Sequence, residues 1–197
     1  MRAMELAARV LENAWVRLEP LEERHRAEMI GAAEADASIF RHMPYPVAEH
    51  GFGPSFDWLL QERAAGRWIP HAVRASDGRV VGQSCYLTIR PRDAGVEIGG
   101  TWYVRAAQGT AINPAAKLAL LDNAFASGAE RVEFKTDTLN AQSRAALTKL
   151  GATFEGVHRR HMRRPNGTWR DSAYFSIIRE EWPDVRAHIE ARLAAFS

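Results

Sequence analysis

The chain has 197 residues, of which 46% are hydrophobic and 25% are charged, and its formal net charge is +2 at pH 7. This length and apolar content suffice for one well-buried core, so we expect a single domain over residues 1–197. The balanced charge argues against intrinsic disorder and against a general nucleic-acid-binding surface.

The single cysteine and the hydropathy pattern narrow the class of protein. Cys85 alone excludes an internal disulfide, and the sequence has no cluster of cysteines or metal-spaced histidines, so no metal site is expected. Charged residues interrupt the apolar N-terminal stretch, and no other run reaches the length of a membrane span. These features predict a cytoplasmic protein without a membrane partner.

Alternation, helical spacing and turn residues predict the elements of the first half. We expect a strand at residues 15–21, helices at 22–35 and 55–65 with a Pro/Gly-rich loop at 42–53 between them, and strands at 68–74 and 80–89. Asp77-Gly78 lies between the last two strands and suits a tight hairpin turn.

A strand at residues 95–104 follows, and paired glycines interrupt it. Simple alternation places Val96, Ile98 and Trp102 on one face and Glu97, Thr101 and Tyr103 on the other. Gly99-Gly100 has no side chains to pack, which is typical of a bulge or of a close approach to the backbone.

The second half predicts alternating helices and strands and a final hairpin. The elements are a helix opening at Asn113-Pro114, a strand at 131–137, a helix from Asn140, strands at 153–162 and 168–178, and a C-terminal helix at 180–197. Asn113 is the expected N-cap of the first helix, whose apolar stripe includes Leu118 and Leu121. Asn166-Gly167 is the expected hairpin turn.

The most specific stretch of the sequence is the helix that begins at Asn140. Asparagine is a good N-cap, small and apolar residues recur at helical spacing, and Gly151 stops the helix. The run Asn-x-x-Ser-Arg-x-x-Leu-x-x-Leu-Gly-Ala, followed by Glu155-Gly156, resembles the second cofactor motif of the GNAT superfamily, the acyl-CoA-dependent N-acetyltransferases. The serine, Ser143, is similar to that of the RimJ/RimL-like branch.

This resemblance extends over residues 15–182 and implies both a fold and a cofactor. The fold is an α/β domain with a GNAT-like mixed, mostly antiparallel central sheet that is flanked by helices and splayed at the cofactor site. The order of the predicted elements agrees with it. Residues 1–13 are then an N-terminal extension, residues 180–197 are a C-terminal helix, and acetyl-CoA (coenzyme A) is the cofactor.

The resemblance also implies a set of cofactor-binding residues: Thr101, Trp102, Tyr103, Gln108, Gly109, Thr110, Ala111, Asn113, Asn140 and Ser143. The amides of a helix N-terminus suit a pyrophosphate. The family's phosphate loop has glycine, and then glycine or alanine, where this chain has Ala111 and Asn113. Taken alone, the segment is also compatible with an ordinary strand-to-helix turn. Because both residues restrict positive φ more than glycine does, we expect an altered loop geometry.

Acetyl transfer to an amine requires removal of the ammonium proton, polarisation of the thioester carbonyl and a proton for the departing thiolate. Glu97 is the candidate base, provided that partial burial raises its pKa, and a structural strand glutamate is the alternative. By resemblance, an amide near Thr101 to Tyr103 holds the carbonyl oxygen. Ser143 is the candidate proton donor, because Leu147 stands where many relatives carry a tyrosine. The alternative for Ser143 is a hydroxyl that caps the helix.

Other groups have both a functional and an ordinary interpretation. Lys117 either reaches a phosphate or remains solvated, and we expect the second. Cys85 is expected to be a buried, inert thiol rather than an acyl carrier. Aromatic residues either line an acceptor pocket or pack in the core: Tyr45, Phe52, Trp58 and Trp68. A basic cluster surrounds the last hairpin and is expected to be a solvated face: Arg159, Arg160, Arg163, Arg164, Arg170, His158 and His161.

Taken together, the sequence predicts an enzyme that transfers an acetyl group from acetyl-CoA directly to a primary amine. The acceptor is a protein N-terminus or a small-molecule amine, no nucleic-acid partner is expected, and a homodimer is left open. One alternative is a non-catalytic acyl-CoA-binding regulatory module, which the degenerate phosphate loop and Leu147 motivate. Another is a basic RNA-binding protein that uses the last hairpin.

Overall fold

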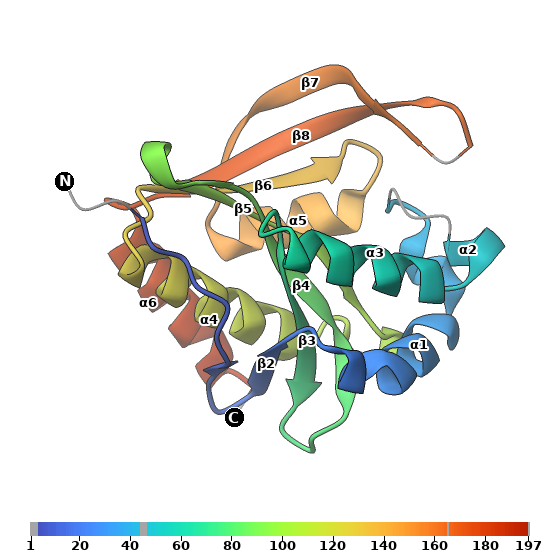
Figure 1. Cartoon of the computed structure of the whole chain (residues 1–197). Coiled ribbons are helices and arrows are strands. Elements are labelled where there is room, and N and C mark those ends of the chain that lie inside the picture. The colour runs from blue at the N-terminus through green and yellow to red at the C-terminus, as the bar shows by residue number, and fades with distance from the viewer. Residues whose placement is uncertain (1–3, 44–46, 165, 197) are drawn as a thin grey trace.

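A computed structural model describes residues 4–43, 47–164 and 166–196, and its described strands form one eight-stranded sheet in the order β1-β2-β3-β4-β5-β6-β8-β7 (Figure 1). The strands are β1 (Leu11–Glu12), β2 (Val16–Pro20), β3 (Ile69–Ala75), β4 (Val80–Arg90), β5 (Gly95–Tyr103), β6 (Arg131–Asp137), β7 (Thr153–Arg163) and β8 (Trp169–Ile178). All neighbouring pairs are antiparallel except β5 and β6. The predicted mixed, mostly antiparallel sheet is therefore confirmed.

Helices cover both sides of this sheet. They are α1 (Arg26–Glu34), α2 (Val47–His50), α3 (Gly53–Ala64), α4 (Ile112–Ala126), α5 (Ala141–Leu150) and α6 (Trp182–Ala194), and the 3-10 turn η2 (Ala37–Phe40) lies between α1 and α2. Figure 1 shows α4 and α6 side by side on one side and α1 and α3 on the other. The four-residue α2 lies within the segment expected to be a loop. None of the described helices combines the length and hydrophobicity that crossing a bilayer requires.

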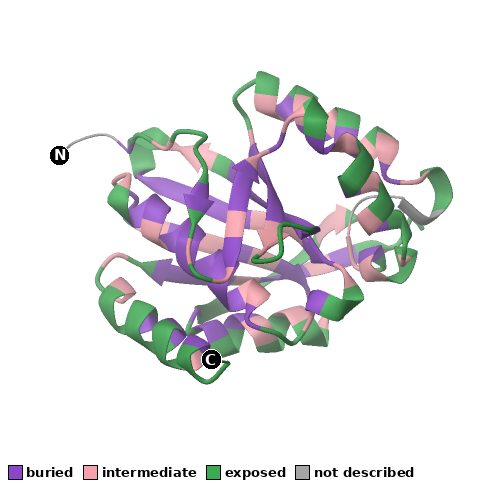
Figure 2. Ribbon diagram, turned by 90° about the horizontal axis from the view of Figure 1, so that it is seen from below, coloured by how far each residue is buried: buried purple, intermediate pink, exposed green. Residues whose placement is uncertain are grey.

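The sheet separates two hydrophobic cores. The larger core joins the sheet to α4, α5 and α6 and includes Leu121, Leu147 and Ile189. The smaller core joins the other face to α1, η2 and α3 and includes Met29 and Phe56. Figure 2 shows the central strands mostly buried and the outer surfaces of the helices exposed. The strands near the middle of the sheet are therefore held from both sides.

A bulge in β5 changes which side chains share a face. Gly100 has a φ of 57°, the register of β4 and β5 shifts between Gln83 and Cys85, and Gln83 Nε2 donates to the oxygen of Gly100 at 2.9 Å. The extra residue inverts the alternation beyond it, so Trp102 packs in the smaller core and Tyr103 in the larger one. The expectation from simple alternation was wrong for Trp102, Thr101 and Tyr103, although the glycine pair did predict the bulge.

The two expected hairpin turns are confirmed. The turns between β3 and β4 and between β7 and β8 contain Gly78 and Gly167 with positive φ, as the Asp-Gly and Asn-Gly pairs predict. Before the first full strand, residues 4–10 form an irregular segment in which Met4 packs into the larger core. The aromatic residues Phe52, Trp58 and Trp68 pack in or against the smaller core, and Tyr45 lies outside the described residues.

Candidate active site

The sheet opens between β5 and β6. These two parallel strands pair only from Gly95 to Glu97 on β5 and from Arg131 to Glu133 on β6. Beyond that point β5 continues to pair with β4, and β6 continues to pair with β8. The facing edges of the two strands therefore have main-chain groups that no strand of the described chain pairs, and this is the predicted splayed site.

A tight loop connects the open end of β5 to α4. Gly109 has a φ of 75°, and the Thr110 hydroxyl donates to the oxygen of Ala107 at 2.8 Å and accepts from the amide of Ile112 at 3.3 Å. Ala111 has right-handed geometry, with φ −62° and ψ −19°, and Asn113 is not among the residues with positive φ. Gly109 is therefore the residue of this loop that has positive φ, and Ala111 and Asn113 adopt backbone conformations that do not require glycine.

The helix α4 begins at Ile112, two residues before Pro114, the first helical residue that the sequence predicts. Ala111 is its N-cap and makes no side-chain cap hydrogen bond, so the prediction that Asn113 caps the helix was wrong. Asn113 instead lies in the first turn, where its amide has no earlier helical carbonyl to bond. The positive end of the helix dipole and this uncapped turn favour an anionic group beside the loop.

On the opposite side of the opening lies the N-terminus of α5. The Asn140 carboxamide oxygen accepts from the amide of Ser143 at 3.0 Å, so Asn140 is the N-cap that its sequence predicts. The Ser143 side chain is half-buried, and its hydroxyl makes no hydrogen bond within the described chain. The alternative in which this hydroxyl caps the helix is therefore not what the structure shows. Leu147, one turn later, is buried in the larger core.

The two sides of the opening meet at a polar contact. Gln142 Nε2, on α5, donates to Gln108 Oε1 at 3.1 Å, and Gln108 Nε2 donates to the oxygen of Tyr103 at 3.0 Å. An open cleft of about 330 Å³ adjoins these glutamines, and it is lined by Ser38, Ile39, Arg41, His42, Arg105, Gln108, Asn140 and Gln142. The cleft brings the phosphate loop, α5 and the segment around η2 to one place.

Glu97 is the buried carboxylate at the point where β5 and β6 separate. Its residue is 3% exposed, and it accepts hydrogen bonds from Lys135 Nζ and from the Thr88 hydroxyl, both at 3.2 Å. Burial raises the pKa of Glu97, although Lys135 and Thr88 stabilise its charged form. Partial burial and a raised pKa are the two conditions that the sequence argument set for a base at this position.

Lys117 was wrongly expected to be solvated. It is 6% exposed, and its Nζ donates to the hydroxyl of Thr101 at 2.9 Å and of Ser84 at 3.2 Å. No carboxylate of the described chain forms an ion pair with it, and burial lowers the pKa of Lys117 to about 7. A signal was present in the sequence, because Lys117 precedes Leu121 by four residues and so lies on the same helical stripe.

Cys85 is fully buried, as predicted. Burial raises the pKa of its thiol to about 12, so almost no thiolate forms near neutral pH. No group of histidine, cysteine and acidic residues able to hold a metal ion occurs within residues 4–43, 47–164 and 166–196. The residues around the opening thus offer a carboxylate, a hydroxyl and main-chain amides that could take part in a reaction.

The basic cluster at the last hairpin divides into two groups. Arg159, Arg160 and Arg163 are exposed, as expected. Arg164 instead forms two hydrogen bonds with the Asp137 carboxylate, at 2.7 and 2.9 Å, and Arg170 is only 7% exposed. The sequence analysis did not single out Asp137, and alternation along β8 was the signal that could have placed Arg170 with Ser172 and Tyr174.

Comparisons with known proteins agree with this architecture. A family model described as an acetyltransferase (GNAT) domain matches residues 16–153. A T. thermophilus structure described as an acetyltransferase shares 34% identity, with 96% of this chain and 100% of that chain covered and a TM-score of 0.84. A GNAT-family structure from Chromobacterium violaceum shares 28% identity, with 93% of each chain covered and a TM-score of 0.87.

A structure of Mycobacterium smegmatis RimJ in complex with CoA-disulfide is also similar, at 26% identity, with 90% of this chain and 88% of that chain covered and a TM-score of 0.77. A comparison with curated proteins found no match. The match to the family model covers more than half of the chain, from β2 to the start of β7. The chain therefore belongs to the GNAT acetyltransferase family as a RimJ/RimL-like member, and its cofactor is acetyl-CoA.

Proposed function

We propose that this protein transfers the acetyl group of acetyl-CoA directly to a primary amine, in a complex that holds both substrates. One observation carries the proposal: the buried Glu97 carboxylate lies at the last residue of β5 that pairs with β6. A proton acceptor therefore lies beside the opened edge of the sheet. The acceptor is the amine of a small molecule or of a protein N-terminus.

The residues around the opening fit the cofactor. Gly109, the Thr110 turn and the uncapped start of α4 offer amides and a helix dipole to a pyrophosphate. The unpaired edges of β5 and β6 offer main-chain donors and acceptors to the amide groups of a pantetheine arm. When bound there, acetyl-CoA supplies an activated acetyl group, whose carbon–sulfur bond breaks as the carbon–nitrogen bond of the product forms.

Glu97 is proposed to accept the proton that the attacking ammonium must lose. A carboxylate with a raised pKa is a stronger base than an exposed one, and the hydrogen bond from Lys135 favours its ionised form. Amides near Thr101 to Tyr103, freed by the bulge at Gly100, are proposed to hold the carbonyl oxygen. These are the same residues that the family resemblance implies.

Ser143 is proposed to donate the proton that the departing sulfur takes up. Its hydroxyl is free of other hydrogen bonds within the described chain, and it lies in the first turn of α5, where the helix dipole favours negative charge nearby. Direct transfer is favoured over an acyl-enzyme because the Cys85 thiol is fully buried and carries a raised pKa.

The test combines binding, turnover and product analysis. Calorimetry measures the affinity for acetyl-CoA, and a thiol-release assay follows turnover with a panel of amines. Mass spectrometry and resistance of the product to alkaline hydroxylamine, which cleaves oxygen esters and thioesters but not amides, then show whether the acetyl group sits on nitrogen. Binding of acetyl-CoA without turnover of any amine would favour the non-catalytic acyl-CoA-binding module instead. An ester product would refute N-acetylation but retain acetyl transfer.

A further inference from the structure

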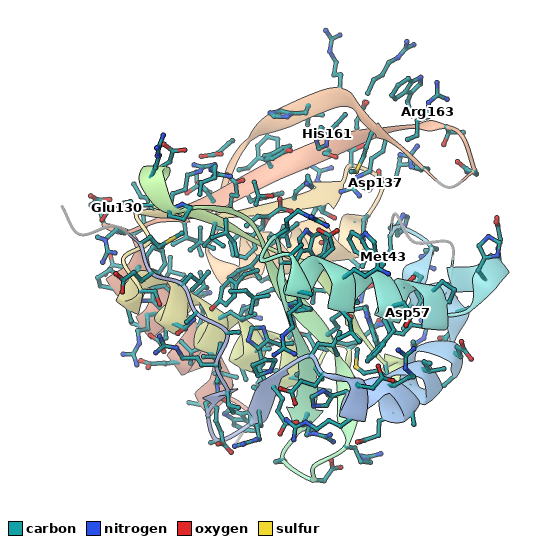
Figure 3. The ribbon with its side chains drawn as sticks, viewed as in Figure 1. Met43, Asp57, Glu130, Asp137, His161 and Arg163 are labelled. Atoms are coloured by element: carbon teal, nitrogen blue, oxygen red, sulfur yellow. The ribbon has the colours of Figure 1, made fainter. Side chains whose placement is uncertain are left out.

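The sheet face that carries Glu97 is strongly polar beyond the opening. We use the name polar face for the side chains that this region gathers from β5, β6, β7 and β8: Glu97, Lys135, Asp137, His161, Arg170, Ser172 and Tyr174. Lys135 pairs with Tyr174 and Asp137 pairs with Ser172 in the ladder, and alternation puts Arg170 on the same side of β8. Figure 3 shows Asp137 and His161 near one another, above Met43 of the segment that follows η2.

Most charges on the polar face are paired within the chain. Lys135 Nζ lies 3.2 Å from the Glu97 carboxylate, and Arg164 binds Asp137 through two hydrogen bonds. His161 makes a 3.0 Å hydrogen bond with the Ser172 hydroxyl and a 3.3 Å one with the Tyr174 hydroxyl. Each carboxylate here therefore already has its own cation.

Arg170 is the cation that remains. It is 7% exposed, its Nε is buried without a hydrogen-bond partner, and it forms no ion pair within residues 4–43, 47–164 and 166–196. The charges of Asp137, Glu97 and Arg164 interact with it only through space. Leaving a guanidinium buried and unbonded is costly, and such a group calls for a partner that the folded chain does not supply.

Burial and the neighbouring cations act in the same direction on two histidines close to Arg170. Burial lowers the pKa of His42, and Arg41, Arg164 and Arg170 lower it further, with Asp137 opposing. Burial also lowers the pKa of His161, and Lys135, His158 and Arg170 add to that effect. Since Lys135 pairs with Glu97 and Arg164 pairs with Asp137, Arg170 supplies the positive charge of the polar face that no carboxylate of the described chain neutralises.

We propose that Arg170 receives the carboxylate of the acceptor, so that the natural substrates are amines that carry their own carboxylate, namely free amino acids. A guanidinium presents a planar fork of donors that matches a carboxylate with two parallel hydrogen bonds. Glu97 lies on the same face, where it accepts the proton of the amine at the other end of such a molecule. This inference rests on the proposed function and narrows it to one class of acceptor.

The test begins with the unmodified enzyme. Thiol release is measured with α- and ω-amino acids, with their carboxamides and with the decarboxylated amines, so that each set differs only in the carboxylate. We expect kcat/KM to be about 10- to 100-fold higher for the amino acids, the range that a charged hydrogen-bonded pair provides. O-Phosphoethanolamine is included to separate a carboxylate from a phosphate.

Variants then assign the preference to one side chain. Arg170→Met is expected to raise KM for amino acids about 10- to 100-fold, to leave kcat nearly unchanged and to leave the carboxamides unaffected. Arg170→Lys keeps the positive charge but not the forked arrangement of donors, and its KM for amino acids is expected to lie between those of the wild type and Arg170→Met. Arg163→Met, at an exposed arginine of the same hairpin, is the matched control and keeps the wild-type constants. Thermal unfolding and acetyl-CoA affinity verify that each variant is folded.

The outcomes separate this inference from the proposed function. Equal turnover of amino acids and carboxamides, a preference for O-phosphoethanolamine, or acetyl-CoA binding without turnover of any amino acid overturns the role of Arg170. The first two results leave N-acetylation intact. If Arg170→Met fails to fold, the wild-type comparison and Arg170→Lys still decide. Absence of acetyl-CoA binding by the wild type overturns the proposed function itself.

Discussion

The Glu97 carboxylate accepts a hydrogen bond from Lys135 Nζ at 3.2 Å, across two strands that separate directly after Glu97. The pair therefore stands where the continuous sheet ends and the opening begins. Burial raises the pKa of the carboxyl group, and the ammonium limits that rise. Burial makes this carboxylate more basic, while Lys135 favours its ionised form, and this leads to the first prediction.

Replacing Glu97 with glutamine is expected to lower kcat by about 100-fold or more, because the amide cannot accept the ammonium proton. In the wild type, activity falls as pH drops through the pKa of Glu97, so the acid limb of the pH–rate profile lies above the usual carboxyl range. Lys135→Met removes the charge that favours the ionised form and moves this limb to higher pH. Profiles of kcat against pH measure both effects.

The control for this experiment is Glu130→Gln, at a carboxylate that pairs with Arg179 on the surface, well away from the opening (Figure 3). Its profile is expected to match that of the wild type. An unchanged acid limb in Glu97→Gln, with undiminished kcat, would exclude Glu97 as the base.

Ser143→Ala is expected to reduce kcat about 10- to 100-fold without a measurable loss of stability, because its hydroxyl makes no hydrogen bond within the described chain. Asn140→Ala is the contrasting variant. It removes the cap of α5 and is expected to cost about 1 kcal/mol of unfolding free energy. Urea denaturation and single-turnover kinetics distinguish the two. Destabilisation by Ser143→Ala of the same size as by Asn140→Ala would assign the serine a structural role.

Lys117→Met is expected to flatten the dependence of stability on pH. The pKa of Lys117 is about 7 in the folded protein and near 10.5 for an ordinary lysine, so between these values the unfolded chain holds a proton that the folded chain does not. The wild-type unfolding free energy therefore rises with pH across this window, by up to about 1.36 kcal/mol per unit from this group. Below pH 7 the contribution is constant.

Urea unfolding from pH 7 to pH 10 measures this slope, and the difference between the two proteins isolates Lys117 from other groups that titrate. Lys149→Met, at an exposed lysine of α5, is the control and is expected to retain the wild-type slope. If Lys117→Met has the same slope as the wild type, the buried amine is not the group that titrates.

Cys85→Ala is expected to retain acetyl transfer, since the thiol is buried and its pKa is raised to about 12. The folded wild type is also expected to resist thiol reagents until urea unfolds it. Steady-state kinetics and the rate of thiol labelling measure the two effects. Loss of turnover in a variant that unfolds normally would reject direct transfer and implicate an acyl-cysteine.

Local signals in the sequence predicted those features that short stretches of chain determine. Asn140 and Gly151 bound α5 because a cap and a C-terminal glycine act within one turn. The Asp77-Gly78 and Asn166-Gly167 turns set their hairpins for the same reason. The opening between β5 and β6 came from family resemblance, because no residue in either strand encodes where two distant segments cease to pair.

Local sequence patterns do not determine the environment of a side chain whose surroundings come from another part of the chain. Lys117 was expected in solvent, but the face of α4 that carries it packs against the sheet. There the hydroxyls of Ser84 and Thr101 accept hydrogen bonds from its amine. Arg170 was grouped with exposed arginines of the hairpin, but it lies opposite Met162 of β7 and is only 7% exposed. Both are polar residues that are as buried as residues of the hydrophobic core, and composition and periodicity do not identify such residues.

The bulge at Gly100 divides β5 into two segments whose side chains alternate between the sheet faces in opposite phase. Glu97, before the bulge, is part of the polar face. Thr101, after the bulge, lies on the opposite side of the sheet, where it accepts a hydrogen bond from Lys117. Removing one of the two glycines would exchange the sides of every later residue in the strand, sending Trp102 toward α4 and Thr101 away from its lysine. One extra residue in β5 thus keeps the Glu97 carboxylate and the Lys117 amine on opposite sides of the sheet.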